Sequence, residues 1–388
     1  MQRFFALFVV ALTMVASANH GLAQAPATAS GNMLVYIGTY TTGTKSKGIY
    51  VSKLDTETGK LSPAELVAES HSPSFLALHP NEKYLYAVNE SAIYNDGTGA
   101  VSAFEIDRSS GKLRSLGQQS SAGAGPAHLS VDRGGKNVLV ANYGGGSVAV
   151  LPINRDGALK SATSLMQHKG RSVNEQRQKE PHAHSITSDP TGKFVYVADL
   201  GLDWILTYQL DERKGLLSLA NPPNVKVEPG SGPRHFSVHP SGQFGYVINE
   251  LTCTVSSFTV NPSTGELKPL ETLSALPPKV SMQQAYSGAE LAIHPLGRFL
   301  YTSIRGHNSI ALFRIDQNTG KLTYVESTPT EGSTPRGFGI DPQGRYLVAG
   351  NQDSNSVVVF RIDPETGRLT PTGTKIDVGA PVSFSFVK

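Results

Sequence analysis

Short runs of alternating apolar and polar residues recur along the chain, and tight polar turns separate them. The clearest example spans residues 237–247, where two alternating runs flank a His-Pro-Ser-Gly turn at 239–242. Alternation with a period of two predicts half-buried strands, and Pro and Gly between the runs predict a turn. A third run follows, as over 310–315 and 357–362, and after a further turn comes a fourth. The repeating unit is therefore predicted to be four antiparallel strands.

The repeat is marked by the phrase Thr-Gly-Lys-Leu and its variants. The phrase ends at Leu61, Leu113, Leu159, Leu217, Leu267, Leu322 and Leu369. Four strands in a repeat of this length are typical of the blade of a β-propeller. The first copy begins at 34–38 without a first strand, and residues 381–386 resemble a first strand without the rest. We therefore expect one all-β domain over 26–388, a seven-bladed β-propeller whose C-terminal strand joins the N-terminal blade and closes the ring.

Residues 1–25 have the pattern of a secretory signal peptide. A positive start at Arg3 precedes an apolar run over 4–18, and Ala-Gln-Ala at 23–25 fits the small-x-small rule for cleavage. The run is shorter than the ~20 apolar residues that cross a bilayer. The sequence thus predicts a periplasmic or secreted protein with no membrane association after cleavage. An uncleaved membrane anchor is the alternative.

Composition supports this fold and removes several classes of function. Only 17% of residues are charged, and 39 Gly and 24 Pro favour short strands and turns over long helices. The formal net charge of +3 leaves no basic field for nucleic acid, which is not expected as a partner. The single cysteine, Cys253, excludes an intramolecular disulfide and a zinc site with two thiolates.

In a propeller the first strand of each blade lines the central channel, and the second strand runs antiparallel to it. The start of the first strand and the end of the second therefore lie at the same rim. First-strand residues at this rim differ from copy to copy and include His128, His184, Arg234, His235, Glu290 and Arg336. The ends of the second strands add Glu90, Asn142, Tyr143, Glu250 and Arg305. Charges that face a narrow channel are costly unless they are paired or solvated, so we expect a water-filled polar pocket and the active site here.

The longest insertion between repeats runs over 161–181. It leads into the first strand of the fourth blade, so we expect it to overhang the same rim as a lid or wall. Its basic residues are His168, Lys169, Arg171, Arg177 and Lys179. These side chains are candidates for receiving an anionic substrate. The alternative is a solvated loop whose charges keep it soluble.

Several short motifs resemble those of one known family. They are Tyr-Ile-Gly-Thr-Tyr-Thr at 36–41, Ala-Asn-Tyr at 141–143, Arg-Gln at 177–178 before Pro-His-Ala-His at 181–184, Asp-Leu-Gly-Leu-Asp at 199–203, Gly-Pro-Arg-His at 232–235, Asn-Glu-Leu at 249–251 and Arg-Gly-His-Asn-Ser at 305–309. Together they resemble the seven-bladed propeller lactonases, which include bacterial 6-phosphogluconolactonase and, more distantly, the fungal carboxy-muconate lactonizing enzyme. The resemblance extends from about residue 33 to the end of the chain. It implies a catalytic cluster of His184 (or His182), Arg234, Glu250 and Arg305 at the rim.

Hydrolysis of a lactone needs a deprotonated water, stabilisation of the developing oxyanion and a proton for the leaving alkoxide. We assign water activation to Glu250 and proton transfer to His184, while Arg234 and Arg305 hold the oxyanion or a substrate carboxylate. The expected substrate is a small, anionic sugar-acid lactone. Residues assigned to its binding are His182, His235, Glu290, Arg336, Asn142 and His128. A covalent serine route is not expected, because no Gly-x-Ser-x-Gly motif is present.

The same residues also fit other interpretations. Arg234 and Glu250 are alternatively a buried ion pair between neighbouring strands, and the histidines at 182 and 184 are alternatively hydrogen-bonded members of the channel wall. The His-x-His spacing suggests a metal, but no third ligand is identifiable, so no metal or other cofactor is expected. Asp199 and Asp203 are expected to fix a turn, with calcium coordination as the alternative. A muconate-type cycloisomerase and a non-enzymatic ligand-binding propeller are the alternatives to a lactone hydrolase.

Overall fold

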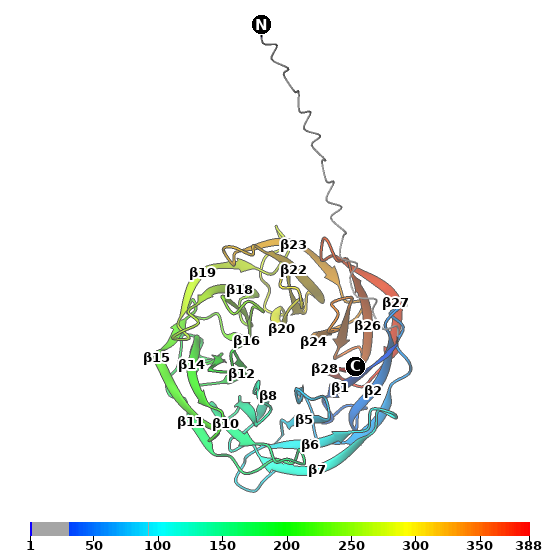
Figure 1. Ribbon diagram of the computed structural model, residues 1–388, viewed down its shortest axis with the longest axis vertical. Coiled ribbons are helices and arrows are strands. Elements are labelled where there is room, and N and C mark those ends of the chain that lie inside the picture. Colours follow the sequence, from blue (N-terminus) through cyan, green and yellow to red (C-terminus); the bar gives the residue numbers. More distant parts are fainter. Residues whose placement is uncertain (2–30, 92) are drawn as a thin grey trace.

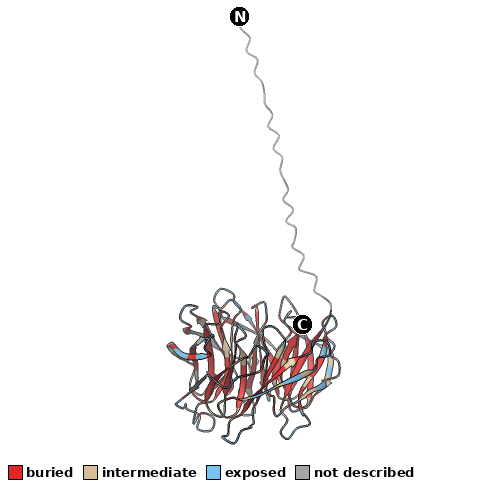
Figure 2. Cartoon of the chain, turned by 60° about the horizontal axis from the view of Figure 1, so that its bottom comes forward, coloured by how far each residue is buried: buried red, intermediate tan, exposed pale blue. Residues whose placement is uncertain are grey.

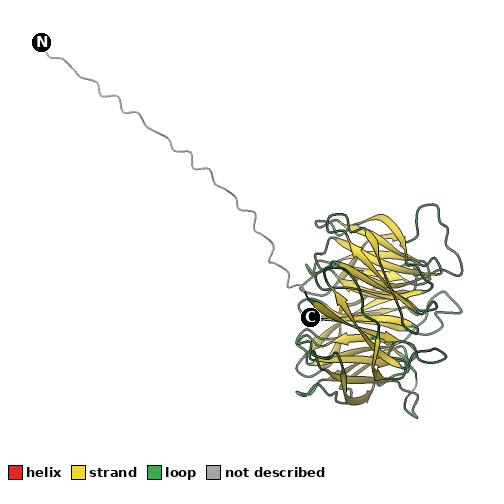
Figure 3. Ribbon diagram, turned by 90° about the vertical axis from the view of Figure 1, so that its right-hand side faces the viewer, coloured by secondary structure: helices red, strands yellow, loops and turns green. Residues whose placement is uncertain are grey.

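The computed structural model describes Met1, residues 31–91 and residues 93–388, and among these it contains strands, turns and loops but no helix (Figure 3). Seven four-stranded antiparallel sheets stand around a central axis, which confirms the predicted seven-bladed β-propeller (Figure 1). Apart from Met1, the predicted signal peptide at 1–25 lies outside the described residues. None of the described residues belongs to a helix long and apolar enough to cross a membrane.

We number the blades one to seven in chain order. Blade one has the order β28-β1-β2-β3, with β28 (Pro381–Val387), β1 (Asn32–Thr39), β2 (Gly48–Asp55) and β3 (Glu65–Glu69). Blades two to four consist of β4 (Leu76–Leu78), β5 (Tyr84–Asn89), β6 (Ala100–Ile106) and β7 (Leu113–Ser120); β8 (Pro126–Val131), β9 (Asn137–Asn142), β10 (Ser147–Pro152) and β11 (Ser164–Gln167); and β12 (Ala183–Ser188), β13 (Phe194–Asp199), β14 (Trp204–Asp211) and β15 (Leu216–Lys226). Blades five to seven consist of β16 (Pro233–Val238), β17 (Phe244–Asn249), β18 (Thr254–Val260) and β19 (Leu267–Ser274); β20 (Ser287–Ile293), β21 (Phe299–Arg305), β22 (Ser309–Ile315) and β23 (Leu322–Pro329); and β24 (Pro335–Ile340), β25 (Tyr346–Asn351), β26 (Ser356–Ile362) and β27 (Leu369–Asp377).

The two ends of the described chain meet in blade one, as predicted. β28 pairs antiparallel with β1, so that Leu34 lies opposite Val387 and Ile37 lies opposite Phe384. The C-terminal strand thereby supplies the inner strand that the N-terminal repeat lacks. Closure in this way removes the open edge that an incomplete blade would leave.

Apolar side chains between neighbouring blades form the core. The buried residues, drawn in red in Figure 2, lie mostly in the strands. Five second strands each contribute a buried tyrosine, which donates its hydroxyl to the carbonyl of the glycine in the Thr-Gly-Lys-Leu-type turn of the next blade. Gly320, the acceptor of Tyr246 at 2.9 Å, has a φ of 70°, a conformation that favours glycine. This contact between blades gives a physical reason for the recurring phrase. The five pairs are Tyr36–Gly111, Tyr86–Gly157, Tyr196–Gly265, Tyr246–Gly320 and Tyr301–Gly367.

A β-bulge at the start of the inner strands presents side chains to the rim of the channel. The pairing of β16 with β17 passes from Pro233 to His235 and leaves Arg234 without a partner. The inner strands β12 and β24 leave out His184 and Arg336 in the same way. The extra residue of a bulge is unpaired, and its side chain is re-aimed relative to a regular strand.

The prediction of a single insertion over 161–181 is wrong. Ser164–Gln167 forms β11, the outermost strand of blade three, which makes four pairs with β10. Its sequence Ser-Leu-Met-Gln lacks the β-branched and aromatic residues that mark strands, which is why the pattern does not reveal it. The connection that reaches the rim is therefore shorter. It comprises residues 168–182, which we call the rim loop.

Candidate active site

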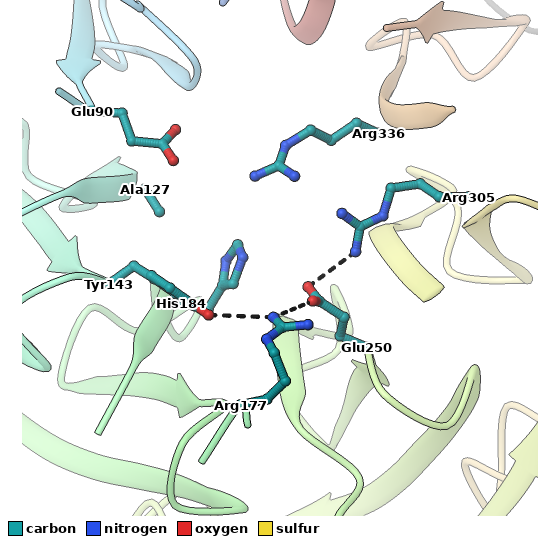
Figure 4. A pocket seen from close by; sticks show the side chains of 8 residues that line it. All are labelled: Glu90, Ala127, Tyr143, Arg177, His184, Glu250, Arg305 and Arg336. Carbon is teal, nitrogen blue, oxygen red and sulfur yellow. Dashed lines mark hydrogen bonds and ion pairs between the residues drawn. The ribbon is translucent and has the colours of Figure 1, made fainter. Parts of the chain in front are cut away.

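A polar cavity of about 280 Å³ lies at the rim that the sequence pattern predicts (Figure 4). Glu90 and Glu250 follow directly after the second strands β5 and β17, and Arg305 ends β21. His184 and Arg336 are bulged residues of inner strands. Six blades and the rim loop thus contribute to one site. The lining residues are Glu90, Ala127, Tyr143, Arg177, His184, Glu250, Arg305 and Arg336.

Three arginines surround the carboxylate of Glu250. Arg177 Nη2 lies 2.6 Å from Glu250 Oε1, and Arg234 Nε and Arg305 Nη2 each lie 3.1 Å from Oε2. Burial opposes ionisation of Glu250, but the three guanidinium groups outweigh it and lower the pKa of the carboxyl to about 2. Glu250 is therefore ionised at neutral pH, and both of its oxygens are engaged in ion pairs.

Arg234 is the most enclosed of these arginines, with 2% of its surface exposed. Its Nη1 donates to the carbonyl of Ala289 at 2.5 Å and to His235 Nε2 at 3.1 Å. Burial, together with the nearby Arg336 and Arg305, lowers the pKa of Arg234 to about 9, so the guanidinium is still cationic at pH 7. It does not line the cavity itself and acts on it through Glu250.

The imidazole of His184 forms part of the cavity wall and is uncharged. Its Nδ1 is enclosed and has no hydrogen-bond partner in the part of the chain that the structure describes. The ring packs edge-on against those of Tyr143 and His235, with centroid separations of 5.2 and 5.3 Å. Burial, followed by the charge of Arg234, lowers the pKa of His184 well below its ordinary 6.5. At neutral pH the ring therefore has a lone pair that can accept a proton.

Glu90 and Arg336 form the part of the cavity wall away from Glu250 (Figure 4). Tyr40 and Ser74 both donate their hydroxyls to Glu90 Oε2, at 2.7 and 2.5 Å. The guanidinium of Arg336 lies over the ring of Tyr40, 5.2 Å from its centroid, and points into the cavity. Within 31–91 and 93–388 it makes no ion pair at 4.0 Å or less. Arg336 is thus free to bind an anion, whereas the other three arginines already hold Glu250.

The balance of charge around the cavity is positive. Arg177, Arg305 and Arg336 line it, and Arg234 stands behind Glu250, whereas two carboxylates, those of Glu90 and Glu250, offset only part of this positive charge. A concave site with an excess of one sign favours ligands of the opposite sign. The arrangement therefore combines an uncharged base with donors that suit an anionic ligand or a developing oxyanion.

The rim loop brings Arg177 to the cavity, where its Nη2 also donates to the hydroxyl of Tyr143 at 3.3 Å. His168, expected as a solvated or substrate-receiving residue, is instead buried at the start of the loop. Its Nδ1 lies 2.6 Å from Asp199 Oδ2, and its Nε2 lies 2.9 Å from the hydroxyl of Tyr208. This buried contact anchors the start of the loop to blade four. The other basic residues of the loop are exposed and do not line the cavity: Lys169, Arg171 and Lys179.

Two residues assigned to substrate binding lie behind the cavity wall. The ring of His182 stacks on that of Tyr143 at 4.5 Å, and His182 Nδ1 lies 3.0 Å from the Tyr143 carbonyl oxygen. Asn142 is fully buried and donates to the hydroxyl of Ser147 and to the backbone carbonyl of Ser121, in the connection between blades two and three. Both therefore support the wall and do not line the cavity.

His128, His235 and Glu290, which the sequence also assigns to substrate binding, lie in the next layer of the channel. None of them lines the cavity. His128 and His235 each follow a bulged position, and regular pairing resumes at them, with His128 opposite Ala141 and His235 opposite Ile248. Glu290 lies within the irregular part of β20, where the pairing passes from Gly288 to Leu291. Because the bulge re-aims only the preceding side chain, neighbours in sequence end in different layers.

Glu90 and Tyr143 line the cavity, although the sequence predicts no role for either of them beyond a place at the rim. Both stand at the second-strand positions of the rim, so their place in the repeat is the signal that finds them. Their residue types alone carry no such signal, because tyrosine and glutamate recur at many other positions of this chain. The pairing of Tyr143 with Arg177 and of Glu90 with Tyr40 depends on side-chain geometry.

The two aspartates near the rim loop have structural partners. Asp199 Oδ1 accepts hydrogen bonds from the backbone N–H groups of His182 and Leu202, so it fixes the turn after β13. Asp203 accepts from the N–H groups of Gly230 and Gly232, each at 2.7 Å, and so holds a neighbouring loop. Among the described residues, no three His, Cys, Asp or Glu side chains gather as a metal site requires.

Comparison with known proteins agrees with this architecture. The family model described as lactonase, 7-bladed beta-propeller, matches residues 34–386. The 6-phosphogluconolactonase of Bacillus subtilis is 39% identical over 306 residues, which cover 79% of this chain and 84% of the relative. A putative 6-phosphogluconolactonase of Bacteroides fragilis has a crystal structure that aligns with a TM-score of 0.86 at 36% identity, over 94% of this chain and 100% of that one. The structure of the periplasmic gluconolactonase of Pseudomonas aeruginosa aligns with a TM-score of 0.86 at 32% identity, over 92% of this chain and 99% of that one. The chain therefore belongs to the seven-bladed β-propeller lactonase family.

Proposed function

We propose that this protein is a lactone hydrolase that opens an anionic sugar-acid lactone by adding water to its carbonyl group. The observation that carries the proposal is the uncharged His184, which stands in the cavity wall beside an arginine-caged carboxylate. The names of the relatives support the same class of reaction, since those of Bacillus subtilis and Pseudomonas aeruginosa are a 6-phosphogluconolactonase and a gluconolactonase.

The contacts favour His184 over Glu250 as the group that activates water. A carboxylate with a pKa of about 2 is a weak base, and both oxygens of Glu250 are held by arginines. In the proposed reaction His184 takes a proton from water, and the hydroxide adds to the lactone carbonyl carbon. The ring C–O bond then breaks, and His184 returns the proton to the departing alkoxide. The product is the open hydroxy acid, which releases one proton at neutral pH.

Glu250 and Arg305 supply the electrostatic part of this mechanism. Arg305 Nη2 is held between Glu250 Oε2 at 3.1 Å and the carbonyl of Gly288 at 3.0 Å, which fixes the guanidinium in the cavity wall. A donor fixed in this way stabilises the oxyanion without reorganising during the reaction, and one such donor typically contributes about 10²- to 10³-fold. We assign to Glu250 the task of holding Arg177, Arg234 and Arg305 in place.

The opposite wall suits the rest of the substrate. Arg336 is the free cation for a phosphate or carboxylate on the lactone, and the carboxylate of Glu90 is an acceptor for sugar hydroxyls. The predicted signal peptide and the periplasmic location of the Pseudomonas aeruginosa protein support action outside the cytoplasm. We therefore propose an anionic sugar-acid lactone without fixing whether its charge is a phosphate or a carboxylate.

A pH-stat assay over a panel of lactones tests this function. The panel contains neutral aldonolactones and their phosphorylated and carboxylate-bearing forms, with the spontaneous rate subtracted for each. We expect acid release well above the spontaneous rate, fastest with an anionic lactone. Acid release that never exceeds the spontaneous rate would overturn the proposal. A change in ultraviolet absorbance on addition of a muconate, without acid release from any lactone, would instead identify a cycloisomerase.

Replacing Arg336 by methionine is expected to raise KM for the anionic lactones by about tenfold or more, because a hydrogen bond to a charged group contributes about 1.5–3 kcal/mol. KM for neutral lactones should change little, since they lack the group that Arg336 binds. The matched control is Arg361→Met, because Arg361 also lies over a tyrosine ring, at 5.0 Å, but far from the cavity. Equal effects of Arg336→Met on neutral and anionic lactones would remove Arg336 as the anion site.

A further inference from the structure

Beneath the cavity, the central channel holds a second cluster of titratable side chains that the proposed mechanism does not use. It consists of His128, His235 and Glu290, which are all buried. The ring of His235 lies 5.2 Å from that of His128 and 5.3 Å from that of His184. His235 therefore connects this deeper layer to the cavity wall.

The hydrogen bonds of His235 define which of its nitrogens carries the proton. Arg234 Nη1 lies 3.1 Å from His235 Nε2, and an arginine can only donate. Nε2 must therefore accept, so the proton of the uncharged ring is on Nδ1. That proton faces Glu290 Oε1 at 2.7 Å, which also accepts from the backbone N–H of Leu291 at 2.9 Å. A chain of hydrogen bonds thus runs from Glu290 through His235 to Arg234.

This chain of hydrogen bonds ends on the guanidinium of Arg234, which in turn holds Glu250. Arg234 Nη1 is shared between His235 Nε2 and the carbonyl of Ala289, and its Nε faces Glu250 Oε2 at 3.1 Å. Without the acceptor on His235, Nη1 would keep only the Ala289 carbonyl, and the guanidinium would be held less firmly in the orientation that points its Nε at Glu250.

We propose that Glu290 and His235 are positioning residues for lactone hydrolysis, which fix the guanidinium of Arg234 and through it the carboxylate of Glu250. This inference rests on the proposed function and replaces the substrate-binding role that the sequence assigns to both residues. Neither residue lines the cavity, so both act through Arg234.

The charges around Glu290 give the pair a dependence on pH. Arg234 and His235 face it from β16, His128 from β8 and Arg336 from β24. Burial raises the pKa of Glu290 to about 7, although these neighbours oppose the rise. An ionised Glu290 accepts more strongly from His235 Nδ1–H and so makes Nε2 a better acceptor for Arg234. The hold on Arg234 is therefore strongest above pH 7 and weakens as Glu290 takes up a proton.

Two substitutions at Glu290 separate its geometry from its charge. Glu290→Gln keeps an oxygen that accepts from His235 and Leu291 but cannot titrate. We expect wild-type kcat to rise about 2- to 10-fold as pH increases through 7, because this factor corresponds to the strength of about one hydrogen bond. The kcat of Glu290→Gln should stay level over the same range. Glu290→Leu removes the acceptor and should lower kcat by about tenfold or more, with little change in KM for a neutral lactone.

The control is Glu271→Gln, because Glu271 also accepts a backbone N–H, that of Leu322, but lies outside the channel. Its kcat and pH profile should match those of the wild type. A merely structural Glu290 would leave the pH step near 7 in Glu290→Gln unchanged. Retention of that step, or wild-type kcat in Glu290→Leu, would overturn the proposal.

A measurement on the wild-type protein tests the hydrogen-bond chain without any lactone. In protein labelled with ¹⁵N-histidine, the signal of His235, assigned by its loss in His235→Gln, should show an uncharged ring with the proton on Nδ1 from pH 6 to 8. A proton on Nε2, or a charged ring, would contradict the chain. If the lactone panel shows no hydrolysis but the Nδ1 proton is found, the proposed function fails while the arrangement of Arg234 stands.

Discussion

Replacing Glu250 by glutamine is expected to lower kcat by at least about a hundredfold. The substitution keeps the size of the side chain but removes the charge that holds Arg177, Arg234 and Arg305 around one point. Without it the three cations repel one another, and Arg305 leaves the position from which it stabilises the oxyanion. Loss of a single well-placed donor already costs about 10²- to 10³-fold in kcat. The measurement is kcat by pH-stat on the best lactone of the panel.

The same substitution also removes a buried charge, so stability has to be measured beside activity. Breaking a buried ion pair by removing one partner costs about 3–5 kcal/mol of unfolding free energy. Thermal unfolding then defines the temperatures at which the variant is folded, and kcat is compared there. Glu105→Gln is the control, because its pair with Arg114 is exposed and contributes little. Near-normal turnover in folded Glu250→Gln would remove Glu250 from the mechanism.

The fold could be predicted from the sequence because the signals that define each repeat are local in the chain. Each copy carries its own alternating runs and turns, and the incomplete copies at 34–38 and 381–386 complement one another, as the pairing of β1 with β28 confirms. The exception is β11, where a four-residue outer strand leaves no alternation to detect. A strand that packs on only one neighbour needs no strong pattern, and for this reason its sequence does not reveal it.

The sequence predicts which residues lie at the rim of the channel, but it does not predict the role of each residue there. Position in the repeat places His184, Glu250 and Arg305 around one cavity, where the structure also has them. Arg234 and His235 are neighbours in sequence, and only the bulge shows that one holds Glu250 while the other holds Arg234 from below. The role of Glu250 changes for a related reason, since the number of arginines that reach it is set by side-chain geometry.

Replacing His184 by glutamine is expected to lower kcat by about 10²- to 10⁴-fold, the usual contribution of a positioned base. Glutamine preserves much of the shape of the ring but cannot accept a proton from water. Because Nδ1 of His184 has no partner in the described chain, its loss breaks no hydrogen bond and should cost little stability. The pair of results, a large fall in kcat and a small change in unfolding temperature, distinguishes this variant from Glu250→Gln.

The pH dependence of kcat in His184→Gln decides which group is the base. The pKa of His184 is lowered well below its ordinary 6.5, so the active, uncharged ring persists below that pH. Below the smaller step that Glu290 gives near pH 7, wild-type kcat should therefore show a second, larger fall when the ring of His184 is protonated at a still lower pH. In His184→Gln the residual rate should lack this fall. His71→Gln, a change at an exposed histidine, should keep both the rate and the fall. If the residual rate of His184→Gln kept the wild-type fall, the titrating group would lie elsewhere, and Glu250, with a pKa of about 2, would return as the base.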